Sequence, residues 1–292
     1  MIDIKVKILI VCIAVVTLAV LKVYIDNFTF EINYFLIKIK SNFKNSILSK
    51  SKFSEKVIVH ISDLHSRFYG ENNSKLISAI DKINPDYVFL TGDMVNADDS
   101  TFESFESLIK AIGLKYKCFY ITGNHELEIK DMHFDSYLKL KNLLKNYRVT
   151  FLCDESVELE NDVVLYGLSY FRNRDDEKND IVSVQDIENR LGKVDERKFN
   201  ILLAHNPIFF ETYAKWGADL VFSGHIHGGM IRILGQGIFS PTRVLFPKYT
   251  GGKIYESKDY NNSQLILSRG LSAGRSGFRF FNTPELIVAR FK

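Results

Sequence analysis

Residues 56–65 read KVIVHISDLH, a β-branched and apolar run that ends directly in Asp63 and His65. This density of Val and Ile favours a short buried strand. A strand that stops at an aspartate and a histidine places both side chains near its carboxyl end, where open α/β sheets carry their ligand sites. The stretch therefore predicts an α/β fold with a polar site at the carboxyl edge of a sheet.

Four further apolar runs end in the same way. They span residues 86–91, 118–122, 199–204 and 218–223, and they lead into Gly92-Asp93, Gly123-Asn124-His125-Glu126, His205 and Gly224-His225-Ile226-His227. Each block alone is more often a solvated turn, because Gly and Asn tolerate positive φ. Five strand ends that carry Asp, Asn and His together predict one convergent site.

The side chains of these blocks form a plausible metal-ligand set. The candidate ligands are Asp63, His65, Asp93, Asn124, His205, His225 and His227. Carboxylates, imidazoles and an amide oxygen suit divalent Mn, Fe or Zn better than soft copper. Seven ligands exceed the need of one tetrahedral Zn, so we expect two ions about 3.5 to 4 Å apart that share a carboxylate. His60, inside a strand, and His133, in a polar helical stretch, are expected to be structural.

In this order the blocks resemble the calcineurin-like metallophosphoesterase superfamily, whose signature runs Asp-x-His, Gly-Asp, Gly-Asn-His-Glu/Asp, His, Gly-His-x-His. The likeness covers residues 56–292. Residues 228–232, 268–271 and 280–286 resemble a narrower branch, the membrane-associated bacterial phosphoesterases of the UDP-2,3-diacylglucosamine pyrophosphatase type. Ser66-Arg67 departs from that branch, which usually has an apolar residue and a glycine at these positions.

The resemblance implies a fold and a role for each site residue. The implied fold is a four-layer αββα sandwich of two mixed sheets. Asp93 would bridge two metals. The first metal would be held by Asp63, His65 and His227, and the second by Asn124, His205 and His225. His125 would face the scissile phosphate as general acid or as a stabiliser of transition-state charge. The implied reaction is in-line attack by metal-bound hydroxide, with no covalent enzyme intermediate.

The N-terminus predicts a transmembrane helix, because residues 8–21 are apolar apart from Thr17. With Lys7 and Lys22 snorkelling, residues 4–25 suffice for a hydrocarbon core of roughly 30 Å. A cleavable signal peptide is the rival interpretation, but no Ala-x-Ala site follows, so an uncleaved single-pass anchor is favoured. A buried core helix is disfavoured because the segment has no polar stripe. Lysines flank both ends, so the side on which the catalytic domain lies stays open.

The rest of the chain is expected to complete a single catalytic domain. The expected divisions are an anchor over 1–27, a first strand and linker over 28–55, and a metallophosphoesterase domain over 56–292. Alternation from Phe28 to Tyr34 predicts that first strand. Ser100 and Glu103 fit a capping box for the helix that follows. Free thiols are the default for the cysteines, since only Cys118 and Cys153 could pair.

These features predict a phosphohydrolase with two divalent metal ions per chain, Mn first and Fe or Zn as alternatives. The expected substrate is a phosphodiester or pyrophosphate, in a nucleotide-linked lipid or a related small molecule, met at a membrane. A net charge of +3 with dispersed lysines does not favour nucleic acid, and no protein partner can be inferred. A nuclease or broad-specificity phosphodiesterase, and a catalytically silent metal-binding membrane scaffold, are the alternatives. The loop over 171–180 with Arg172 and Arg174, together with Arg269 and Arg275, offers further arginines that could grip a phosphate.

Overall fold

The apolar run at residues 56–62 forms strand β2 (Ile58–Ile61) in the computed structural model, which describes residues 3–37, 48, 51–171, 181–240, 244–257, 259–260, 263–274 and 277–292. Side chains of this strand alternate between two cores, as the period of a strand requires. Val59 and Ile61 face a layer of helices, whereas Ile58 faces a second sheet. The strand is therefore buried on both sides, which explains its continuous hydrophobicity.

The first sheet contains six strands in the order β1-β14-β2-β3-β4-β5. Besides β2, these strands are β1 (Glu31–Ile37), β14 (Glu285–Phe291), β3 (Tyr87–Leu90), β4 (Lys117–Tyr120) and β5 (Thr150–Phe151). The strands from β2 to β5 are parallel, and β14 is antiparallel to β2. Because β1 pairs with β14 along its whole length, the predicted first strand closes this sheet at its edge.

The second sheet also contains six strands, in the order β12-β13-β9-β8-β7-β6. They are β12 (Ile254–Glu256), β13 (Gln264–Leu267), β9 (Leu220–Ser223), β8 (Phe199–Ala204), β7 (Val163–Leu168) and β6 (Glu155–Glu160). The four central strands are parallel, and the two outer strands are antiparallel to their neighbours. A short hairpin of β10 (Arg232–Ile233) and β11 (Gln236–Gly237) lies in the loop between β9 and β12.

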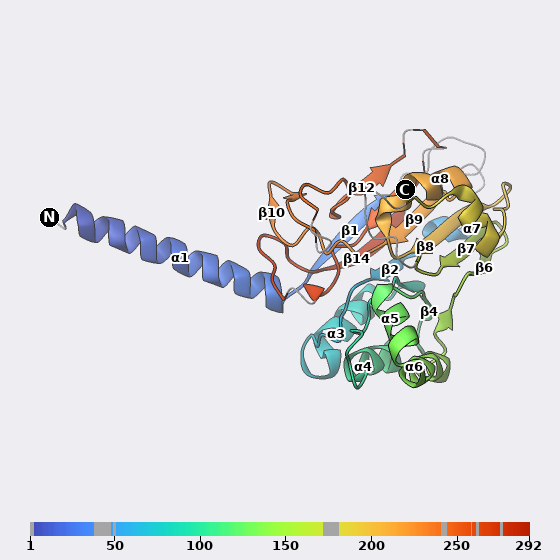
Figure 1. Ribbon diagram of the computed structural model, residues 1–292, viewed down its shortest axis with the longest axis horizontal. Helices are drawn as coiled ribbons and strands as arrows, with labels where there is room; N and C mark the ends of the chain where they lie inside the picture. The colour runs from blue at the N-terminus through green and yellow to red at the C-terminus, as the bar shows by residue number, and fades with distance from the viewer. Residues whose placement is uncertain are drawn as a thin grey trace.

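Helices cover the outer face of each sheet (Figure 1). The first sheet carries α3 (Ser74–Ile83), α4 (Glu103–Ile112), α5 (Asn124–Met132) and α6 (Phe134–Asn146), and the second carries α7 (Val184–Leu191) and α8 (Phe210–Trp216). Single 3-10 turns are η1 (Lys52–Glu55), η2 (Glu71–Asn73) and η3 (Pro207–Phe209). The predicted four-layer αββα sandwich is confirmed.

The two sheets meet through an aromatic core. Phe89 of the first sheet packs edge-on against Phe222 of the second, with ring centroids 5.2 Å apart. Both side chains are completely buried. Edge-to-face packing of this kind stabilises a core beyond the area that it buries.

The N-terminal helix α1 (Ile4–Phe28) projects away from the sandwich (Figure 1). Its length and its mean hydropathy of 2.8 suffice to cross a membrane, and none of its most apolar window is buried, although a signal sequence would pass the same test. The helix includes Phe28, so the first strand begins at Glu31 and the prediction of a strand from Phe28 is wrong at that end. Asp26 and Asn27, in its last turn, are buried against the globular part.

The start of α4 also differs from the expectation. The helix begins at Glu103 with Phe102 at the N-cap, and no side chain caps it. Glu103 thus occupies the first helical position instead of the third, so the predicted capping box of Ser100 and Glu103 is wrong. The core contacts of Phe105, Leu108 and Ile112 fix the helix, because packing outweighs a capping preference.

Replacing Phe89 by alanine should destabilise the sandwich. Loss of a buried aromatic ring costs about 3–5 kcal/mol through lost transfer energy and the cavity left behind. Thermal or urea unfolding of the full chain in detergent measures this loss. Phe134→Ala is the matched control, since that ring on α6 is exposed. Equal destabilisation by both substitutions would contradict the assignment of Phe89 to the core.

Candidate metal centre

The predicted site residues lie in tight turns at the carboxyl ends of five strands. Five of them, namely Asp63, His65, Asp93, His225 and His227, have φ between +46° and +75°. Residues other than glycine seldom adopt this region, and they persist there only where the surroundings hold them. The left-handed turns aim the side chains back over the strand ends, so that residues far apart in the sequence converge.

Two glycines of the motifs are required by close approach. A Cβ atom at Gly123 would lie 2.2 Å from Asp93 Oδ1, and one at Gly224 would lie 1.8 Å from Ser62 Oγ and 2.3 Å from Asp63 Oδ2. Any side chain at these positions would displace a carboxylate of the site. The glycines therefore serve the spacing of the site, in addition to permitting the turns.

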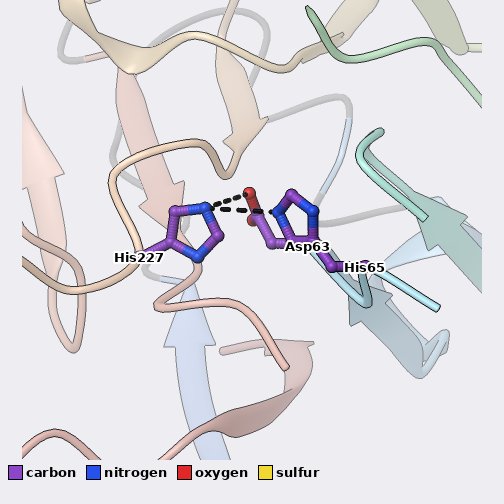
Figure 2. A group of neighbouring side chains, drawn as sticks. All are labelled: Asp63, His65 and His227. Atoms are coloured by element: carbon purple, nitrogen blue, oxygen red, sulfur yellow. Dashed lines mark hydrogen bonds and ion pairs between the residues drawn. The ribbon is translucent and has the colours of Figure 1, made fainter. Parts of the chain in front are cut away.

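Asp63, His65 and His227 form one cluster of potential ligands, with their polar atoms pointing toward one another (Figure 2). His227 Nε2 lies 3.5 Å from Asp63 Oδ1 and 3.4 Å from His65 Nε2. All three residues are buried. Two imidazole nitrogens facing each other at this distance, beside a carboxylate, are arranged as the first shell of a cation.

A second cluster contains Asp93, His205 and His225. His205 Nε2 lies 3.2 Å from Asp93 Oδ2. The same carboxylate oxygen is 3.8 Å from His65 Nε2, so Asp93 stands between the two clusters. Asn124 begins α5 beside Asp93, and its Oδ1 atom is buried without a hydrogen-bond partner. A buried acceptor with no donor is the kind of orphan that a cation satisfies.

The hydrogen bonds of three histidines orient their Nε2 atoms as ligands. Each Nδ1 atom faces an oxygen: Asn96 Oδ1 at 2.9 Å for His65, the Thr91 carbonyl at 2.6 Å for His205 and the Ser272 carbonyl at 2.8 Å for His227. Each of these oxygens accepts a hydrogen bond from Nδ1–H, which leaves Nε2 as the nitrogen available to a metal. Metal-binding histidines are held in this manner.

His125 has the opposite arrangement. The backbone N–H of Ala97 donates to its Nδ1 atom at 3.1 Å. Nδ1 is therefore an acceptor, so the proton of the neutral ring is on Nε2. His125 lies in the same site, with its ring centroid 4.7 Å from that of His65, and its backbone N–H donates to Asp93 Oδ1 at 2.9 Å. Its side chain is thus arranged to donate a proton rather than to coordinate.

The electrostatics of the site fit divalent ions. Burial lowers the pKa of His65 and of His225 to about 4 and that of His227 to about 3, so these rings are neutral near pH 7. Burial also lowers the pKa of His205, but Asp93 and Asp63 outweigh it and raise the value to about 10, so without a metal this ring is protonated and a bound metal would displace its proton. Burial raises the pKa of Asp93, but His205 and its neighbours hold it well below the usual range. Ionised carboxylates and neutral imidazoles are the forms that bind metals.

The other histidines and the candidate arginines are placed elsewhere. His60 is buried between the sheets and pairs with Thr91 Oγ1 at 2.8 Å, while His133 is exposed between α5 and α6. The prediction that Arg269 grips a phosphate is wrong, because its guanidinium pairs with Glu31 and Glu285. Arg172, Arg174 and the rest of that loop up to residue 180, like Arg275, lie outside the described residues. Cys12, Cys118 and Cys153 are free thiols.

Glu126 is a site residue to which the sequence analysis assigned no role. Its carboxylate accepts hydrogen bonds from the backbone N–H groups of Gly123, Asp93 and Met94, at 2.8, 2.9 and 2.7 Å. It thereby joins the two turns that carry Asp93 and Asn124. Its position at the third residue of α5 is a sequence signal for capping that could have revealed this role. Tyr170, whose hydroxyl lies 3.4 Å from His225 Nε2, has no comparable signal.

Glu126→Gln should weaken metal binding although Glu126 is not a candidate ligand. An amide supplies one acceptor oxygen where the carboxylate supplies two, so at least one of three buried N–H groups loses its partner and the Asp93 turn shifts. We expect affinity for Mn²⁺ to fall about 10- to 100-fold, as for other supporting residues. Titration calorimetry measures this, with Glu106→Gln on the exposed face of α4 as control. Unchanged affinity would show that Glu126 does not position Asp93.

Comparisons with known proteins agree with this geometry. A metallophosphoesterase of Aquifex aeolicus (strain VF5) is 25% identical over 261 residues, which cover 89% of this chain and 93% of that protein. The metallophosphoesterase YkuE of Bacillus subtilis (strain 168) is 26% identical, with 80% and 78% covered. The UDP-2,3-diacylglucosamine pyrophosphatase LpxG of Chlamydia muridarum (strain MoPn / Nigg) is 24% identical, with 80% and 82% covered.

The family model of the calcineurin-like phosphoesterases matches residues 56–229, more than half of the chain. The match begins at the strand that leads to Asp63 and ends just after His227, so it contains all seven candidate ligands and His125. The chain belongs to the calcineurin-like phosphoesterase family and is a metallophosphoesterase, a hydrolase of phosphoester bonds.

Proposed function

We propose that this chain is a binuclear-metal phosphohydrolase that cleaves a phosphodiester or pyrophosphate bond in a nucleotide-linked lipid. The observation that carries the proposal is the contrast among the buried histidines. In His65, His205 and His227 an oxygen engages Nδ1 and leaves Nε2 facing the site, whereas in His125 Nδ1 is the acceptor and the proton is on Nε2. Ligands and a proton donor at one place are what hydrolysis of a phosphate ester requires.

In the proposed site, Asp93 would be shared by two metal ions. Its carboxylate lies in two groups of potential ligand atoms, one with His65 and His125 and the other with His205 and His225. Asp63, His65 and His227 complete the first position. Asn124, His205 and His225 would complete the second position. The Oδ1 atom of Asn124, which is buried without a hydrogen-bond partner, would be the oxygen ligand there.

When bound, two divalent ions activate water as the nucleophile and neutralise the phosphoryl oxygens. The chain's own residues supply the rest. His125 Nε2 donates its proton to the leaving oxygen, and the Ala97 N–H keeps the ring in the tautomer that can do so. Glu126 accepts a hydrogen bond from the backbone N–H of Asp93, and the backbone N–H of His125 donates to the Asp93 carboxylate. Mn is the first choice for the metal, because the donor set mixes carboxylate, amide and imidazole, and Fe or Zn are the alternatives.

A lipid-linked substrate accords with the anchor and with one relative. Helix α1 is long and apolar enough to span a membrane. The LpxG protein of Chlamydia muridarum is described as a UDP-2,3-diacylglucosamine pyrophosphatase. In this scheme residues 1–27 anchor the chain, residues 28–55 supply β1 and a linker, and residues 56–292 carry the chemistry beside the lipid surface.

His125→Ala and Asp93→Asn should separate catalysis from metal binding. We expect His125→Ala to keep both metals and to lose about 10²- to 10⁴-fold in kcat, the contribution of a positioned general acid. Asp93→Asn should lose metal and activity together. Metal content by mass spectrometry and turnover of a chromogenic phosphodiester measure the two effects, and His133→Ala is the exposed-histidine control. Loss of metal in His125→Ala would overturn its assignment as a proton donor.

A substrate panel should identify the bond that is cleaved. The Mn-loaded full chain in detergent is offered UDP-linked lipids, dinucleotides, cyclic nucleotides and single-stranded DNA. We expect the UDP-linked lipid to have the highest kcat/KM, and chelation to abolish turnover of every substrate. Preference for DNA would instead identify a nuclease. Absence of turnover with both metals bound would identify a catalytically silent scaffold.

A further inference from the structure

A group of exposed apolar side chains lies on the loops that follow the metal site. We call it the apolar rim, and it consists of Ile233, Leu234, Leu245, Phe246, Phe278 and Phe281. Leu234, at the tip of the β10–β11 hairpin, is fully exposed. Scattered exposed hydrophobic residues are normal, but several that lie close together mark an interaction surface.

Backbone hydrogen bonds hold the segments of the rim together. The N–H of Arg232 donates to Phe280 O at 3.0 Å, and the N–H of Ile238 donates to Ile231 O at 2.8 Å. The N–H of Phe246 in turn donates to Ile238 O at 2.8 Å. The three segments around residues 231–238, 245–246 and 280 therefore lie side by side.

The backbone of the rim is strained in a way that its own packing does not explain. Leu234, Phe246 and Phe281 have φ of +49°, +51° and +52°. Large apolar residues rarely adopt this region, where Gly or Asn would be strain-free. The side chains of Leu234 and Phe246 are exposed, so burial does not compensate for their strain, whereas the Phe281 ring packs against Phe280 with the ring centroids 4.4 Å apart. Strain that packing leaves unexplained points to a role outside the fold.

The rim adjoins the end of α1. Asn27 Nδ2 donates to Arg279 O at 3.1 Å, and the Arg279 N–H donates to Asn27 Oδ1 at 3.2 Å. Asp26 accepts from Thr283 Oγ1 at 2.6 Å. The ammonium of Lys22 lies 5.6 Å from the ring centroid of Phe281. Figure 1 shows the loop around β10 on the side of the globular part from which α1 leaves.

The same segment is fastened to the metal site. Asn282 Nδ2 donates to His227 O at 2.7 Å, and the Asn282 N–H donates to Asp26 Oδ2 at 3.3 Å. Asn282 thus connects the end of α1 to the candidate ligand His227. The rim, the helix and the metal site form one hydrogen-bonded unit.

We propose that the apolar rim is a second membrane contact, seated in the interfacial layer of the bilayer that α1 enters. This rests on the proposed function in taking α1 as the anchor. The occupant is lipid because the rim is continuous with the emerging helix, so the bilayer reaches this surface first. In this placement Lys22, which lies beside Phe281, would reach the level of the lipid phosphates. Two contacts, one helical and one made of loops, fix the orientation of the metal site to the lipid surface.

Leu234→Trp in the full chain tests the rim directly. The protein contains a single tryptophan, Trp216, which is buried in α8. The variant is placed in nanodiscs of phosphatidylcholine with or without bromine on the acyl chains. A side chain at the interfacial depth should lose at least about half of its emission to the bromolipid. No substrate or metal is present, so the result is independent of whether the proposed reaction occurs.

Leu138→Trp is the matched control, because Leu138 is an exposed apolar residue of α6, away from α1 (Figure 1). We expect no bromolipid quenching for this variant or for the parent protein. Equal emission of Leu234→Trp in both kinds of nanodisc would overturn the proposal. If quenching is absent and each nanodisc holds two chains, the rim is a contact between copies of the chain. This result would also overturn the proposal.

Discussion

The structure depends on the burial of two carboxylates, Asp63 and Asp93, at a place where water does not reach them. Ionised groups in such a place must be compensated, or they would change their protonation. The compensation comes from His205, whose Nε2 lies 3.2 Å from Asp93 Oδ2, and from the backbone N–H groups of His125 and His225, which donate to Asp93 and Asp63. These contacts join strand ends of both sheets at the edge of the apolar core through which the sheets pack.

Compensation requires turns that bring the strand ends into contact. Gly123 and Gly224 allow neighbouring backbone to approach the two carboxylates, where a Cβ atom would collide with them. Glu126 adds a third buried carboxylate. It is not a candidate metal ligand, and it accepts hydrogen bonds from three backbone N–H groups. The site therefore consists of ligands together with a rigid frame, and the frame keeps the ligands at a spacing suited to metal ions.

The end of the candidate membrane helix is part of the same frame. Asp26 and Asn27 are polar residues at the end of an apolar helix, and they are buried because they bond to residues 279–283. Asn282 continues the connection to the His227 carbonyl. These bonds fix the end of the helix to the candidate metal site, so the two keep one relative orientation.

The sequence by itself determined the five strand ends, the seven candidate ligands and the apolar helix, because these features depend on local periodicity and on turn residues. It also predicted the layered α/β fold by resemblance. Only the tertiary structure shows which atom engages the Nδ1 of each histidine, since the partner comes from a distant segment, as Thr91 does for His205 at a separation of 114 residues. It likewise decided that β1 pairs with β14 and that Arg269 is engaged by Glu31 and Glu285. Such contacts follow from how whole layers pack, which no local pattern records.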